Sequence, residues 1–219
     1  MIYKTVKTVG IGFRRFIFLG VIFLIYFDNA ATSGHKPKTV INAVENALER
    51  LSANPGRSGH SLSQKAALML YSVRKTIADM FGASGEENVV FTANCTQSIN
   101  MVIKGVLSSA DRVIVSDLEH NAVMRPLYKI GVAYDTARVS LEDDGETVKN
   151  FETLIKKDTK MIFCTAASNV CGKALPLEKI GRLCKDNDLL FAVDAAQAAG
   201  VIPIDMKKNE YRLSLHRAS

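Results

Sequence analysis

Four polar residues that suit a cofactor site stand at or shortly after the ends of short apolar runs in this sequence: Thr96, His120, Asn169 and Asp194. Each apolar run is typical of a buried strand. In open sheets of parallel strands, ligands bind beyond the carboxyl ends of the strands. A hydroxyl, an imidazole, an amide and a carboxylate at such ends are suited to holding a flat, anionic cofactor.

Thr96 and His120 each have two interpretations. Thr96 stands at the predicted start of a helix, where free backbone N–H groups and a hydroxyl bind a phosphate, but a threonine there also serves as a plain N-cap. His120 follows the run that ends at Ser116, and its imidazole can stack on a ring or exchange protons near neutral pH. A solvated surface histidine is the alternative.

Asn169 and Asp194 follow the next two apolar runs. Asn169 either donates to a phenolic oxygen of a cofactor or is an ordinary turn residue. Asp194 ends a five-residue apolar run, so we expect it to be at least partly buried and to need a cation or several donors. A protonated pyridine nitrogen is such a cation, whereas the alternative is another helix N-cap.

The segments around these residues alternate between two hydrophobic periods. Apolar positions at helical spacing alternate with short apolar runs from residue 88 onward, after two helices nearer the N-terminus. This alternation predicts an α/β fold with a mainly parallel sheet covered by helices on both faces. The expected strands are 88–92, 112–116, 132–139, 160–164, 189–193 and 201–204, and the expected helices are 39–51, 63–81, 122–130, 148–156 and 177–186, with one more through residues 99–103.

Composition excludes several classes of protein. With 47% hydrophobic and 23% charged residues, the chain is neither disordered nor fibrous. The net charge of +6 is concentrated in residues 1–24, which hold four basic and no acidic residues, so no basic stripe for nucleic acid remains. The four cysteines lack zinc-ligand spacing and suit free thiols in a reducing cytoplasm. No glycine-rich nucleotide motif occurs.

Both ends of the chain differ from its middle. Residues 16–27 form an apolar run of 12 residues after a basic stretch, which is too short to span a membrane. Three interpretations stay open for residues 1–24: a mis-assigned start, a signal or anchor, and a true extension. At the other end, residues 211–219 follow the last predicted strand without a closing helix, so we expect the domain to be incomplete.

Six ordered motifs give the middle of the chain a family resemblance. They are Tyr26–Thr32, Asn54–His60, Phe91–Asn100, Glu119–Asn121, Ser168–Val170 and Val193–Gln197. Together they resemble the class V aminotransferase and cysteine desulfurase family over residues 25–210. The resemblance implies the large domain of pyridoxal-phosphate fold type I, incomplete at the C-terminus.

The resemblance also implies residue roles and a reaction. The reaction would remove sulfur from L-cysteine or a related amino acid, giving alanine and a protein-bound persulfide, in a homodimer that passes sulfur to an acceptor protein. The implied roles are phosphate binding for Cys95 and Thr96, ring stacking and catalysis for His120, contact with the phenolic oxygen for Asn169 and Gln197, pairing with the ring nitrogen for Asp194, and contact with the substrate for Ala30 and Asn169.

Some family features differ or are missing. Gln97, Ala166 and Cys171 stand where glutamate, histidine and threonine are usual. The family's cofactor lysine directly follows a histidine, and no histidine–lysine pair follows Asp194 in these 219 residues. The persulfide cysteine and an arginine for the substrate carboxylate belong to later segments. We therefore expect a truncated chain, shortened by an inserted base near Tyr211, that is inactive as given.

Two other functions remain as alternatives. One is a non-catalytic, truncated product of the same fold. The other is a membrane-attached binding module, which rests on residues 1–27.

Overall fold

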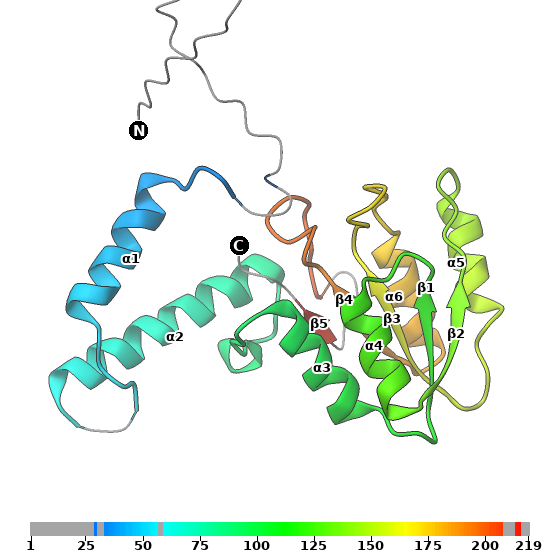
Figure 1. The fold of residues 1–219 in the computed structure, drawn as a ribbon, viewed down its shortest axis with the longest axis horizontal. Coiled ribbons are helices and arrows are strands. Elements are labelled where there is room, and N and C mark those ends of the chain that lie inside the picture. Colours follow the sequence, from blue (N-terminus) through cyan, green and yellow to red (C-terminus); the bar gives the residue numbers. More distant parts are fainter. Residues whose placement is uncertain (1–28, 30–32, 57–58, 208–212, 216–219) are drawn as a thin grey trace, which may run out of the picture.

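Five parallel strands form one sheet in the computed structural model, which describes residues 29, 33–56, 59–207 and 213–215 (Figure 1). The order across the sheet is β2-β1-β3-β4-β5. The strands are β1 (Arg112–Ser116), β2 (Ala133–Ala137), β3 (Thr159–Thr165), β4 (Leu190–Asp194) and β5 (Leu213–Leu215). The mainly parallel α/β sheet expected from the alternating pattern is confirmed.

Helices cover both faces of the sheet because the strands are apolar on both sides. In β1, Val113 and Val115 pack with α3 (Cys95–Val106) and α4 (Asn121–Ile130), while Ile114 packs with α6 (Leu177–Asp186) and Phe151 of α5 (Asp144–Glu152). Successive side chains of β3 and β4 also pack alternately against the helices on one face and on the other. Such near-continuous apolar strands are typical of a parallel sheet that is buried on both faces.

Two further helices extend to one side of this body (Figure 1). α1 (Lys38–Arg50) buries no residue, and its apolar side chains Val40, Ile41, Val44 and Leu48 are all exposed. α2 (Ser61–Phe81) enters the core only near its C-terminus, where Phe81 joins the cluster on the α6 side. Gly82 ends α2 at φ +64°, and a Cβ there would come within 2.5 Å of Asp205, so glycine is required.

Two expected strands are not present. Residues 88–92 follow a short 3-10 helix, η1 (Glu86–Asn88), and form no strand. Val90 and Phe91 are exposed, because no neighbouring strand pairs with this segment within the described residues. Residues 201–204 form turns and bends instead, and Pro203 has no N–H to donate to a strand ladder.

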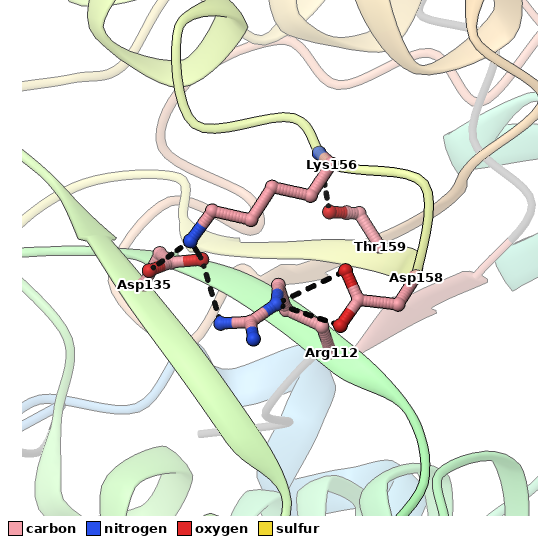
Figure 2. A network of polar contacts seen from close by, with 5 residues as sticks. All are labelled: Arg112, Asp135, Lys156, Asp158 and Thr159. Carbon is pink, nitrogen blue, oxygen red and sulfur yellow. Dashed lines mark hydrogen bonds and ion pairs between the residues drawn. The ribbon is translucent and has the colours of Figure 1, made fainter.

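A network of charged side chains ties together the amino ends of β1 and β2 (Figure 2). Arg112 donates to Asp135 at 3.0 Å and to Asp158, which precedes β3, at 3.0 Å. Lys156 reaches Asp135 at 2.8 Å. Hydrogen bonding to Lys156, then to Arg112, holds the pKa of Asp135 below its usual value of 3.8. This network lies at the edge of the sheet opposite the polar residues predicted for the site.

No helix within the described part of the chain is long and apolar enough to cross a membrane. The alternative of a membrane-attached module rests on residues 1–27, which lie outside the described residues.

Candidate cofactor site

The strand order reverses between β1 and β3. From β1 the chain goes to β2 on one side and then returns to β3 on the other. At such a switch point the connections leave in opposite directions and open a crevice at the carboxyl ends, where ligands bind. The polar residues that follow β1, β3 and β4 therefore lie on the side of the sheet where this fold binds ligands, beyond the carboxyl ends of the strands.

Asp194 ends β4 and is 5% exposed, so the burial expected for it is confirmed. Its Oδ1 accepts hydrogen bonds from the N–H of Ala196 at 2.9 Å and from the thiol of Cys95 at 3.5 Å. The alternative of a helix N-cap is wrong, because turns and not an α-helix follow it. No lysine or arginine of the described residues forms a salt bridge with this carboxylate.

The start of α3 lies against Asp194 through Cys95. Asn94 is the N-cap, because its side chain accepts from the N–H of Gln97 at 2.9 Å. Gln97 in turn accepts from the N–H of Ala93 at 2.8 Å. The N-cap alternative for Thr96 is therefore wrong. The exposed Thr96 hydroxyl makes no hydrogen bond within the described residues and is available to a ligand.

His120 caps α4 and shares an open depression with Thr96. Its Nδ1 accepts from the N–H of Ala122 at 3.0 Å, so in the neutral ring the proton is on Nε2. The depression holds about 310 Å³, and cationic Arg125 and Lys129 also line it. An anionic group bound there would lie in a positive field.

The structure connects the other residues predicted for the site less directly to Asp194 and His120. Asn169 is exposed in the turn after β3, where the Ser168 hydroxyl accepts from the N–H of Val170 at 3.2 Å. Gln197 is half-buried in the turn after Asp194. No hydrogen bond joins either side chain to Asp194 or His120 in the described part of the chain. Ala30 lies outside the described residues.

Glu119 is a site residue that the sequence did not single out. Its Oε1 accepts from the hydroxyl of Ser116 and from the N–H of Thr165 at 2.8 Å. Its Oε2 is buried without a hydrogen-bond partner, although part of the residue remains exposed. Burial raises the pKa of this carboxyl to about 8, and the charge of Asp194 contributes. The only sequence signal was its place between a strand end and His120.

The four cysteines are free thiols, as expected. Cys164 is fully buried, and its burial holds the pKa of the thiol well above the usual 9.0. Cys171 is exposed, and a hydrogen bond with Ser168 lowers the pKa of its thiol.

Comparison with known proteins agrees with this geometry. The family model for aminotransferase class V matches residues 25–216. The chain belongs to the class V aminotransferase family. This family uses pyridoxal phosphate. The assignment confirms the resemblance seen in the six motifs.

Relatives within the family include cysteine desulfurases. A probable cysteine desulfurase of Borreliella burgdorferi is 33% identical over 85% of this chain and 46% of its own length. The apo structure of cysteine desulfurase from Thermococcus onnurineus has a TM-score of 0.74 at 31% identity, covering 86% of this chain and 48% of that one. SspA in complex with cysteine has a TM-score of 0.78 at 28% identity, covering 88% and 56%. The chain thus spans about half the length of the curated relatives it matches.

Proposed function

We propose that this chain forms the cofactor-binding part of a pyridoxal-phosphate-dependent cysteine desulfurase. The observation that carries the proposal is Asp194, a buried carboxylate with no cation paired to it in the described residues. A buried carboxylate is strongly stabilised by a cationic partner. The protonated ring nitrogen of pyridoxal phosphate is a partner of the right charge, and the family uses that cofactor.

The residues around Asp194 suit the rest of the cofactor. We assign its phosphate to the start of α3, at Cys95 and Thr96, where backbone N–H groups and a hydroxyl favour an anion. His120 is assigned to the face of the ring, and Asn169 and Gln197 to the phenolic oxygen. Ala30 and Asn169 are assigned to the amino-acid substrate.

Each residue then has a definite chemical task. The bound cofactor supplies a protonated ring that accepts electrons from the substrate. Asp194 holds the proton on the ring nitrogen, because a nearby negative charge favours the cationic form. Since Nδ1 of His120 accepts from Ala122, Nε2 is the atom of this imidazole that is free to hold or move a proton. The segments that follow β1 and β3 would orient the ring, because ligands bind at such a reversal of strand order.

The finer parts of the proposal follow from the relatives. We assign L-cysteine or a related amino acid as substrate, alanine and a protein-bound persulfide as products, and a homodimer and a sulfur acceptor protein as partners of the whole enzyme. The 219 residues contain no histidine–lysine pair after Asp194. We therefore expect a polypeptide of this sequence to bind the cofactor without a covalent bond and to release no sulfide from cysteine. This expectation keeps the non-catalytic alternative as the second candidate.

The test is the affinity for pyridoxal 5'-phosphate, measured by equilibrium dialysis. Asp194→Asn keeps an oxygen for the Ala196 N–H but removes the charge, so affinity is expected to fall about tenfold or more. Asp186→Asn, at an exposed aspartate of α6, is the matched control and should bind as the wild type does. Equal affinity of Asp194→Asn and wild type, or no binding by the wild type, would contradict the proposal.

A further inference from the structure

Glu119 occupies the switch point itself. It follows β1, and its Oε1 takes one hydrogen bond from Ser116 at the end of β1 and another from the backbone of Thr165 at the end of β3. These two strands border the crevice in which this fold binds ligands. The side chain therefore joins the two walls of the crevice.

The link extends to both residues proposed to hold the ring. Glu119 precedes His120 directly in the chain. On the other side, Thr165 pairs with Asp194 across β3 and β4. The next N–H, of Ala166, donates to the Asp194 carbonyl at 2.8 Å. One hydrogen bond, from Thr165 to Glu119, thus connects the segment that carries His120 to the strand pair that carries Asp194.

Burial and the lack of a donor to one oxygen favour the neutral form of this carboxyl, although each hydrogen bond by itself favours the charged form. Both donors bind Oε1, and Oε2 has none. An ionised carboxylate would leave half its charge on a buried oxygen without a donor, which is costly. The titratable groups that face it are Asp194 of β4 and Cys164 of β3, and neither is cationic. No lysine or arginine in the described part of the chain forms a salt bridge with it.

We infer that Glu119 is a positioning residue, a neutral carboxylic acid that ties the ends of β1 and β3 and so sets the spacing between His120 and Asp194. Burial raises the pKa of this carboxyl to about 8, which agrees with a neutral acid at neutral pH. The proton is on Oε2, because Oε1 accepts both hydrogen bonds. That the spacing between His120 and Asp194 serves cofactor binding rests on the proposed function. The link that Glu119 makes between β1 and β3, and the protonation of its carboxyl, do not rest on it.

Two measurements without any cofactor test the protonation of Glu119 and its hydrogen bond with Thr165. The wild type at about pH 6, below the raised pKa, should show the infrared carbonyl band of a protonated acid, because exposed carboxyls are ionised there. Glu119→Gln should remove this band, and Glu142→Gln, at an exposed glutamate, should keep it. Hydrogen exchange of the Thr165 amide reports the bond itself. Protection is expected in the wild type and in Glu119→Gln, and its loss is expected in Glu119→Ala.

The third readout is the pH profile of affinity for pyridoxal 5'-phosphate. Between about pH 6 and about pH 10 the affinity of the wild type should fall about tenfold more than that of Glu119→Gln, because only the wild type gains a buried charge. A merely structural role would lower binding equally at both pH values.

The outcomes separate the two proposals. Absence of the protonated-acid band in the wild type, or a Thr165 amide that exchanges equally fast in wild type and Glu119→Ala, overturns the inference. Parallel pH profiles for wild type and Glu119→Gln overturn it as well. If the band and the protection are present but no cofactor binds, the proposed function fails and the tie stands. Should Glu119→Gln not fold, the wild type alone decides the protonation, because its protonated-acid band should be present at about pH 6 and absent at about pH 10, above the raised pKa.

Discussion

At Glu119, burial and hydrogen bonding act on the carboxyl in opposite directions, and burial has the larger effect. Its pKa rises from 4.5 to about 8, even though Ser116 and Thr165 both donate to it. The unfolded chain therefore loses this proton near pH 4.5, while the folded protein keeps it until about pH 8. Within that window the folded state binds one more proton than the unfolded state, so the free energy of unfolding falls as the pH rises.

This difference gives a stability prediction for the single residue. Between about pH 4.5 and about pH 8 the wild type should lose stability relative to Glu119→Gln by at most about 1.4 kcal/mol per pH unit. Above about pH 8 the difference should stay constant. Urea unfolding of both proteins at several pH values measures it. A difference that does not change across this window would show that Glu119 ionises normally in the folded protein.

The sequence predicted some residue environments and not others. The burial of Asp194 followed from its place at the end of an apolar strand, and the structure confirms it. Glu119 was only a member of a motif, because a glutamate after a strand is usually solvated. Its carboxyl accepts a hydrogen bond from the backbone of Thr165, which is 46 residues away in the chain. Contacts of that kind cannot be read from local pattern.

Among the elements, those with regular apolar periods were predicted best. Residues 112–116 and 177–186 have the expected bounds, because their apolar periods are regular and their ends are marked. Residues 88–92 have strand composition but no partner strand among the described residues, and so form none. A strand needs a neighbour for its backbone groups, and composition alone does not say where that neighbour is.

The network at the amino ends of the strands (Figure 2) gives a prediction at this scale. Asp135→Asn removes the anion shared by Arg112 and Lys156, which should cost about 1 kcal/mol at low salt and less at high salt, because the groups are partly exposed. The pKa of Asp135 is lowered in the folded state. The stability that this carboxylate contributes is therefore present above pH 3.8 and is lost as the pH falls further.

Thermal unfolding at neutral and acidic pH checks this second variant. Asp79→Asn, at an exposed aspartate of α2, is the control and should match the wild type. The difference between wild type and Asp135→Asn should shrink in acid and in high salt. A difference that persists unchanged in both conditions would mean that Asp135 acts through packing and not through charge.

For the whole molecule, the layered α/β architecture followed from the alternating pattern, but the strand order did not. The reversal between β1 and β3 depends on which side of β1 each crossover takes, and it is at such reversals that open α/β sheets bind ligands. The exposed apolar side of α1 is a similar case. An amphipathic pattern predicts a helix with an apolar face but does not say what covers that face.

The central claim is that Asp194 receives a protonated ring nitrogen. The most direct measurement is the NMR shift of that nitrogen in isotope-labelled pyridoxal 5'-phosphate bound to the 219-residue protein, at a pH where the free ring is neutral. We predict a protonated ring with the wild type and a neutral ring with any cofactor bound to Asp194→Asn. A neutral ring nitrogen in the wild-type complex would contradict the account.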